Sequence, residues 1–200
     1  MDPARARAET NLSIKSAILA VVAFAGSVVG ALAVEEAPHQ VLSRDGDFEI
    51  REYPHLAVAE TTVQADRSSA AYTGFRLLAG YIFGGNASRQ EIAMTAPVIE
   101  APAPNVPAGA GWVIRFMMPS GSSLTNLPRP NADGVTLREE PAARFAVLRF
   151  SGLATDAAVT ARTADLSGWM KNRNLAPSGT PLIAQYDPPW TLRSCAETRS

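Results

Sequence analysis

Alternating apolar and polar side chains predict the strands in the first half of this chain. In Asp47–Arg51, Phe48 and Ile50 alternate with charged neighbours, as in a strand with one buried face. Three further apolar or β-branched runs are expected to be strands: His55–Val63, Met94–Glu100 and Trp112–Met118. A stretch rich in proline, glycine and alanine separates the last two and predicts an irregular loop.

A helical pattern follows the second of these strands. Its apolar side chains recur every three or four residues, at Tyr72, Phe75, Leu78 and Ile82. Asp66 and Ser68 can each cap the first turn, and the pair Gly84-Gly85 is expected to end the helix. The pattern predicts an amphipathic helix with one face on a sheet.

The second half repeats the order of the first. After a polar connection at Ser120–Asn131, the expected elements are strands at Val135–Glu139 and Phe145–Phe150, a helix at Asp156–Arg173 and a strand at Leu182–Tyr186. Arg138 and the second helix each follow their counterparts by about 87 residues. The order β-β-α-β used twice predicts a pseudo-twofold α+β fold, with a mostly antiparallel sheet and both helices packed on it.

The N-terminal region predicts export. Basic residues precede Ser16–Val34, which carries no charge, and Ala31-Leu32-Ala33 matches the small-residue pattern of a signal-peptidase site. Because a bilayer core needs about 20 apolar residues, an uncleaved anchor is also long enough. Residues 1–33 are therefore expected to be a signal peptide or an N-terminal membrane anchor. Both alternatives place the folded part outside the cytoplasm, in the periplasm or on the outer face of the inner membrane.

Composition excludes several classes of function. The 200 residues carry a formal net charge of −1, so no basic face for nucleic acid is expected. His39 and His55 are the two histidines, and Cys195 is the one cysteine. With two histidines and one cysteine, the sequence offers no hydrolytic triad, no zinc-ligand cluster and no intrachain disulfide. The glycine motifs of nucleotide-binding loops are also missing. No catalytic set can be named, and we expect no enzyme activity.

Six ordered segments resemble the SOUL/heme-binding-protein family. They are Phe48–Tyr53, Tyr81–Asn86, Met94–Val98 (MTAPV), Asn126–Pro130 (NLPRP), Ala146–Gly152 (AVLRFSG) and Tyr186–Trp190 (YDPPW). The resemblance covers about Val41 to Arg193. It implies a distorted β-barrel made of two pseudo-twofold-related β-α-β halves, with two long helices on the outside. The expected divisions are residues 1–33, a linker at 34–40, the SOUL-like domain at 41–193 and a tail at 194–200.

The resemblance also implies a ligand and its site. Family members bind heme and related tetrapyrroles, and the heme site of the family lies beside the first helix. On that helix the candidate slot residues are Tyr72, Phe75, Leu78 and Tyr81. Arg76 is the one cation there and is expected to pair with a propionate. Each apolar side chain has a second interpretation, because the same spacing is typical of core packing beneath a helix.

The candidate iron ligand is His55. Some members of the family carry histidine at the position of Glu52, and His55 follows three residues later. A surface or packing role for His55 stays open, and an apolar slot can also hold a porphyrin without an axial ligand. Met117 and Met118 lie in an alternating strand, where core packing is the default interpretation.

The leading hypothesis is therefore an exported module that binds heme or another tetrapyrrole reversibly, as a carrier or buffer. A second hypothesis assigns the same fold to a different amphipathic ligand or to a protein partner. A heme-dependent enzyme is a third, for which the sequence offers no residues. Membrane association is expected only if the N-terminal segment is retained.

Overall fold

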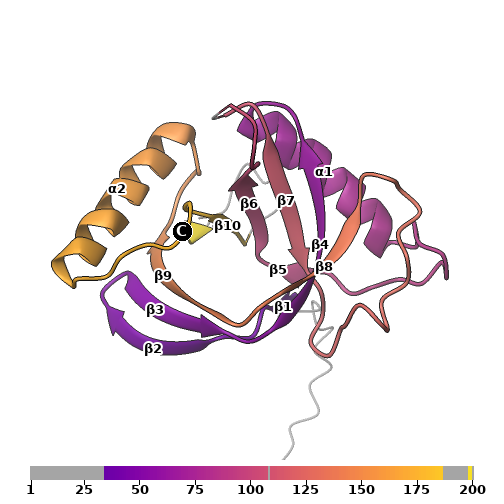
Figure 1. The fold of residues 1–200 in the computed structure, drawn as a ribbon, viewed down its shortest axis with the longest axis horizontal. Coiled ribbons are helices and arrows are strands. Elements are labelled where there is room, and N and C mark those ends of the chain that lie inside the picture. Colours follow the sequence, from indigo (N-terminus) through magenta and orange to yellow (C-terminus); the bar gives the residue numbers. More distant parts are fainter. Residues whose placement is uncertain (1–33, 108, 187–197, 200) are drawn as a thin grey trace, which may run out of the picture. The chain divides into compact units, whose positions relative to one another are not determined.

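The computed structural model describes residues 34–107, 109–186 and 198–199, which form two helices and eleven strands (Figure 1). In chain order these are β1 (Glu35–Glu36), β2 (Gln40–Asp45), β3 (Phe48–Tyr53), β4 (Leu56–Val63), α1 (Arg67–Ile82), β5 (Thr95–Ala96), β6 (Val98–Pro102), β7 (Trp112–Met117), β8 (Thr136–Glu140), β9 (Ala143–Phe150), α2 (Asp156–Asn172), β10 (Ile183–Gln185) and β11 (Thr198–Arg199). The α+β class expected from the sequence is confirmed.

Nine of these strands form one antiparallel sheet in the order β2-β3-β9-β11-β10-β6-β7-β4-β8. Within the described residues no ladder joins the end strands β2 and β8, so the sheet is open there and the expected distorted β-barrel is not confirmed. Both ends suit an edge position. Every residue of β2 is exposed and its pairing is interrupted between Val41 and Ser43, while β8 carries the charged run Arg138-Glu139-Glu140.

Strands from the two halves of the chain cross over to pair with each other. β3 of the first half pairs with β9 of the second half, and β4 of the first half pairs with β8 of the second half. β6 and β10 join the two groups at the middle of the sheet. The pseudo-twofold relation between the halves stays a prediction, because this pairing describes connectivity and not superposition.

Helix α1 covers β4 and β7 and builds the larger core. The Asp66 carboxylate accepts a hydrogen bond from the Ser69 backbone N–H at 3.1 Å and caps the first turn. Gly74 lies so close to β7 that a Cβ would overlap the side chain of Ile114. The cluster around this contact includes Phe75, Leu78, Tyr81, Ile82, Ile114 and Phe116. The glycine therefore sets the close approach of helix and sheet.

Helix α2 covers β9 and β3 with fewer buried side chains. Leu166 and Trp169 are its buried residues, and they pack with Leu148 and Phe48. The rings of Phe48 and Trp169 stack with centroids 5.1 Å apart. The Trp169 indole N–H donates to the Asp45 carboxylate at 2.9 Å. Trp169 thus contributes both a stacked ring and a hydrogen bond to the contact of this helix with the sheet.

Most expected elements lie where the sequence predicts them, but one expected strand is divided, and the strands β1, β2 and β11 were not predicted. The strand expected at Met94–Glu100 is divided into β5 and β6 by Pro97, which has no backbone N–H for a ladder. Within 34–40, the expected linker, Glu35 and Glu36 form β1 and pair in parallel with β5. The Ala37 N–H donates to the Ala96 carbonyl at 2.8 Å, and Ala37 is buried.

Several expectations fall outside the described residues. They concern the signal peptide or anchor at 1–33, most of the YDPPW segment, and Cys195 in the tail. In the part of the chain that the structure covers, neither helix has the length and hydropathy needed to cross a membrane.

Candidate functional site

The five residues expected to hold heme on α1 lie on two different faces of the helix. Phe75, Leu78 and Tyr81 are buried in the core against the sheet. Tyr72 and Arg76 face outward, with the guanidinium carbon of Arg76 5.9 Å from the Tyr72 ring centroid. The structure therefore does not bring the five side chains together around one slot. Their assignment to a heme site stays a prediction, with Tyr72 and Arg76 as its accessible part.

The Tyr81 hydroxyl has a hydrogen-bond partner in the structure that the sequence does not predict. It donates to the Pro128 carbonyl at 2.9 Å, and burial raises the pKa of Tyr81 to about 12. Gly85 lies against the carbonyl of Gly80, where a Cβ would overlap it, and its N–H donates to that carbonyl at 2.8 Å. In return the Gly85 carbonyl accepts from the Asn131 N–H at 3.1 Å. The family segments Tyr81–Asn86 and Asn126–Pro130 thus hold two loops together.

His55, the candidate iron ligand, lies directly before β4, beside Glu139 of the edge strand β8. Its Nε2 is 3.3 Å from a carboxylate oxygen of Glu139, and more than half of its side chain is exposed. Among the described residues no group of three or more His, Cys, Asp or Glu side chains is arranged to hold a metal ion. Iron ligation by His55 stays a prediction.

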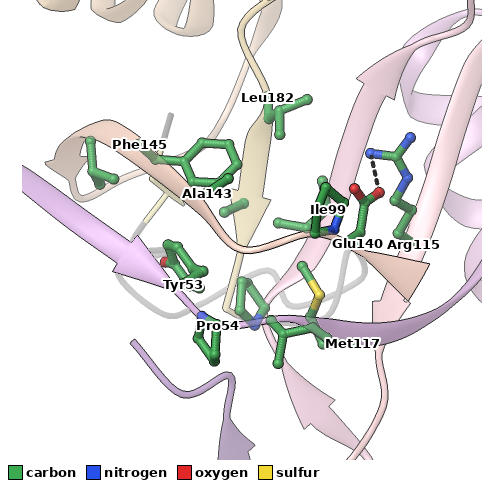
Figure 2. A pocket seen from close by; sticks show the side chains of 14 residues that line it. Tyr53, Pro54, Ile99, Arg115, Met117, Glu140, Ala143, Phe145 and Leu182 are labelled. Atoms are coloured by element: carbon green, nitrogen blue, oxygen red, sulfur yellow. Dashed lines mark ion pairs between the residues drawn. The ribbon is translucent and has the colours of Figure 1, made fainter. Parts of the chain in front are cut away.

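The apolar pocket lies on the face of the sheet turned away from both helices, which we call the inner face. Alternation along each strand separates the two faces: Phe116 packs under α1 while its neighbour Met117 lines the pocket, and Leu148 packs under α2 while Val147 lines the pocket. Lining residues include Tyr53, Leu56, Ile99, Met117, Phe145 and Val147. Figure 2 shows Tyr53 and Phe145 on one side and Ile99 and Met117 on the other.

The pocket has the chemistry of a partial tetrapyrrole site. Its cavity volume is about 150 Å³, whereas drug-sized ligands usually occupy pockets of roughly 300–1,000 Å³. The enclosed part would therefore hold one edge of a porphyrin. The Tyr53 hydroxyl and the Met117 thioether on its walls are of side-chain types that ligate heme iron. The residues present fit the group that the family resemblance implies.

A balanced ion network closes the β7–β8 side of the pocket. The Arg115 Nε lies 2.8 Å from a Glu60 oxygen, and its Nη1 lies 3.5 Å from a Glu140 oxygen (Figure 2). Arg138 also pairs with Glu60 and Glu140. Among the residues that the structure describes on this side, two arginines thus match two glutamates.

Three arginines surround one buried glutamate on the β3–β9 side of the inner face. Glu49 is fully buried and pairs with Arg51 through an Nε–Oε2 contact of 2.6 Å. Arg44 lies 2.8 Å from the same carboxylate, and Arg149 lies 3.6 Å from it. Burial raises the pKa of Glu49, but the hydrogen bond and charge of Arg51 with the charges of Arg44 and Arg149 lower it further, so it lies below its ordinary value. We call these four residues the arginine cluster.

A second buried carboxylate, Glu100, lies where the two helices begin. It pairs with Arg67 at 3.1 Å and accepts a hydrogen bond from Gln185. Arg67 also contacts Asp156, the first residue of α2, at 2.7 Å and donates to the Ala154 carbonyl. Burial raises the pKa of Glu100, and Arg67 and Gln185 offset only part of that rise. One arginine therefore joins β6 to the N-terminal ends of both helices.

Sequence reasoning missed the pocket because its walls come from seven strands, β3, β4 and β6–β10. The sequence feature that could have indicated the pocket is the presence of apolar residues on both faces of β4, β6 and β7. A strand with one solvent-exposed face would instead alternate apolar and polar residues. Met117 was interpreted as core, and Tyr53 was seen as part of a family segment. The pairing of Tyr53 with Ala143 and of Arg51 with Phe145 brings the remaining wall to them.

Comparison with protein families gives one match that covers most of the chain. The model of the family described as SOUL heme-binding protein matches residues 34–195. Among curated proteins, heme-binding protein 2 of Mus musculus is 29% identical over 122 residues. Heme-binding protein 2 of Homo sapiens is 31% identical over 123 residues. Each match covers 60% of this chain and 60% of the relative's length.

Solved structures share the fold at low sequence identity. The EcmrR C-terminal domain superposes with a TM-score of 0.57 and 12% identity, covering 80% of this chain and 94% of that domain. A protein described as a hydrolase from Listeria innocua gives a TM-score of 0.51 and 10% identity, covering 79% of this chain and 92% of the other. At these identities the likeness concerns the fold alone.

Proposed function

The chain belongs to the SOUL heme-binding protein family, and on that premise we propose that it binds heme or a related tetrapyrrole reversibly, as a carrier or buffer. The observation that carries the proposal is the apolar pocket on the inner face, which combines aromatic walls with the Tyr53 hydroxyl and the Met117 thioether. When bound, heme supplies an iron that can accept one of these groups as an axial ligand. Two aromatic side chains, Tyr53 and Phe145, would hold the macrocycle edge.

The pocket is a better site than the outward face of α1. Phe75, Leu78 and Tyr81 fill the core, and removing them from it would expose the sheet beneath. The outward face offers Tyr72 and Arg76 without a surrounding wall. A flat apolar ligand loses more contact with water between two walls than on one exposed ring. Pocket residues therefore come first in the experiment, and the α1 pair is its matched alternative.

The proposed role is that of a binding protein that acts outside the cytoplasm. Family membership supports binding, and the scarcity of histidine and cysteine supports a role without catalysis. The uncharged segment Ser16–Val34 supports export, either to the periplasm or anchored at the outer face of the inner membrane. Measuring the mass of the exported protein separates cleavage after Ala33 from retention of the segment.

Hemin titration of the purified full chain tests the function. We expect a saturable shift of the Soret band at micromolar hemin, reversed by an excess of apomyoglobin as acceptor. A titration without saturation overturns the proposal. Met117→Leu is expected to move the Soret position of the complex if the thioether ligates iron, and His55→Ala moves it if His55 does.

A pair of exposed aromatic residues decides the location. Phe145 at the pocket is 38% exposed and Tyr72 on α1 is 52% exposed, so neither truncation should unfold the protein. We expect Phe145→Ala to weaken hemin binding about tenfold, because a stacked wall is worth about 1.4 kcal/mol. Tyr72→Ala should leave it unchanged. The reverse result would assign the ligand to α1.

A further inference from the structure

The residues 36–39, directly before β2, run along one end of the pocket. β1 pairs in parallel with β5 (Figure 1), and the Ala37 N–H donates to the Ala96 carbonyl at 2.8 Å. Pro97 follows Ala96 and lines the pocket. The Glu36 carboxylate accepts a hydrogen bond at 3.1 Å from the hydroxyl of Tyr186, the first residue after β10. The segment is therefore held beside two strands that carry pocket walls, β6 and β10.

His39, the last residue of this segment, packs on a third wall of the pocket. Its ring centroid lies 5.2 Å from that of Tyr53, which lines the pocket. Gln40 pairs with Glu52 in the β2–β3 ladder, and the same register continued by one residue places His39 opposite Tyr53. Residues opposite each other in a ladder point to the same face of the sheet. The imidazole of His39 therefore belongs to the inner face, one ring away from the pocket.

The hydrogen bond of His39 decides which nitrogen is left for a ligand. Nδ1 lies 3.1 Å from the Ala37 carbonyl oxygen, which can only accept, so Nδ1 carries the proton. The Glu36 carboxylate lies 4.0 Å from the same nitrogen. In the neutral ring Nε2 then presents its lone pair. A histidine that ligates a metal commonly donates its other ring N–H to a backbone carbonyl in this way.

His55 does not share this arrangement. Its Nε2 lies 3.3 Å from a Glu139 oxygen, and 56% of its side chain is exposed. Only 16% of the His39 side chain is exposed, and its ring rests on a wall of the pocket. Of the two histidines in the chain, His39 is the one whose position and hydrogen bond prepare it to bind iron.

The size of the pocket explains why the ligating residue need not line it. The cavity of about 150 Å³ encloses one edge of a porphyrin. Because iron lies at the centre of the macrocycle, it lies outside the enclosed part, beside residues that flank the walls. His39 flanks the Tyr53 wall, whereas Met117 lines the enclosed part itself.

We propose that His39 supplies an axial nitrogen ligand, through Nε2, to the iron of a heme whose edge lies in the apolar pocket. The Nε2 lone pair forms the bond to iron and displaces a weakly bound water, and the ring proton stays on Nδ1. The inference rests on the proposed function and deepens it, because such a ligand makes the site selective for heme over metal-free tetrapyrroles.

Hemin and metal-free protoporphyrin IX test the inference on the full chain. His39→Phe keeps a ring against Tyr53 and removes the nitrogen. The loss of an outer-shell partner alone costs about 10–100-fold in metal affinity, so loss of the ligand should weaken hemin binding at least about tenfold. We also expect the Soret band of the complex to move. Binding of protoporphyrin IX, followed by its fluorescence, should stay unchanged because it contains no iron.

His55→Phe is the matched control, since it makes the same substitution at the other histidine. It should change neither the Soret position nor the affinity for hemin. A Soret shift in His55→Phe but not in His39→Phe overturns the inference and assigns ligation to His55. Equal losses of hemin and protoporphyrin IX in His39→Phe also overturn it, because they indicate a packing role. If His39→Phe does not fold by circular dichroism, His39→Gln gives the same readout.

The wild-type titration separates the failure of the two proposals. Saturable hemin binding that His39→Phe leaves unchanged, in affinity and in Soret position, retains the proposed function and overturns the inference. Absence of saturable hemin binding by the wild type overturns both. Saturable binding with the expected loss in His39→Phe, and with protoporphyrin IX unaffected, supports both.

Discussion

Helices α1 and α2 have nearly the same length, 16 and 17 residues, yet they are attached to the sheet in different ways. α1 buries seven residues and includes a glycine pressed against β7. α2 buries two, and its Trp169 is further held by Asp45 and by Arg173, whose guanidinium lies 4.4 Å from the indole centroid. A long apolar seam fixes the first helix, whereas two buried side chains and the ion pair of Asp156 fix the second.

The difference teaches where a ligand can act without breaking the fold. The side chains of α1 that face the sheet belong to the continuous core, so moving them to contact a ligand would lower the stability of the fold. α2 can open locally at a smaller free energy, since few apolar contacts resist it. The inner face of the sheet, remote from both seams, is the surface that is free to bind.

The largest effect is expected from truncating the α1 seam. Leu78→Ala removes a fully buried side chain and should lower the free energy of unfolding by about 2–5 kcal/mol. Leu77→Ala is the control, because Leu77 is 38% exposed on the same helix and should cost much less. Urea unfolding followed by circular dichroism measures both. Similar losses would contradict the assignment of Leu78 to the core.

The next effect concerns the close approach of α1 to β7. Gly74→Ala forces a Cβ against Ile114, which costs about 1–3 kcal/mol and outweighs the gain of about 1 kcal/mol in helix propensity. Gly80→Ala in the same helix meets nothing within 4 Å and should be neutral or stabilising. Opposite signs in thermal unfolding are the expected result. Stabilisation by both changes would show that the seam tolerates a wider spacing.

A smaller effect is expected at the anchor of α2. Trp169→Phe keeps a ring against Phe48 but loses the hydrogen bond to Asp45, a change of about 1 kcal/mol. Hydrogen exchange should rise in α2 and not in α1, because the loss lies in the local contact of one helix. Equal acceleration in both helices would mean that they open as one unit.

The last prediction is a change of pH dependence at the point that both helices share. The pKa of Glu100 is raised in the folded protein by burial, so its contribution to stability is complete below the ordinary pKa of 4.5 and is lost as pH rises through the higher folded value. Glu100→Gln should reduce the loss of stability with rising pH, while Arg67 keeps Asp156 as a partner. Denaturant midpoints between pH 4 and pH 8 measure the slope. An unchanged slope would show that another group titrates there.

Local patterns predicted the helices well. The spacing of Phe75, Leu78 and Ile82 identifies the buried face of α1, and Asp66 and Gly84 mark its ends; Gly84 has a φ of +97° that suits glycine. The same spacing could not decide whether Phe75 faces a ligand or a strand, because an apolar ligand and the apolar face of a strand both call for an apolar side chain. That decision depends on β7, which lies more than thirty residues later in the chain.

The pocket depends on pairings that no local pattern contains. Tyr53 and Phe145 meet because β3 pairs with β9, with ring centroids 5.5 Å apart. Met117 and Ile99 face them from the other half-sheet, joined through β6 and β10. Glu49 and Arg51 occupy the charged positions of an alternating strand, and both are buried because their face is the inner one. Register, more than residue type, decided their environment.

The buried loop at Asn86 closes one route of covalent modification. Asn86-Ala87-Ser88 has the sequence of an N-glycosylation acceptor. Its carboxamide nitrogen donates to the Tyr81 and Gln90 carbonyls, its oxygen accepts from the Gln90 N–H, and the residue has no exposed surface. A glycosyltransferase needs that nitrogen accessible, so the folded protein is not a substrate. In a eukaryotic secretory host, a glycan attached before folding would keep the loop from forming.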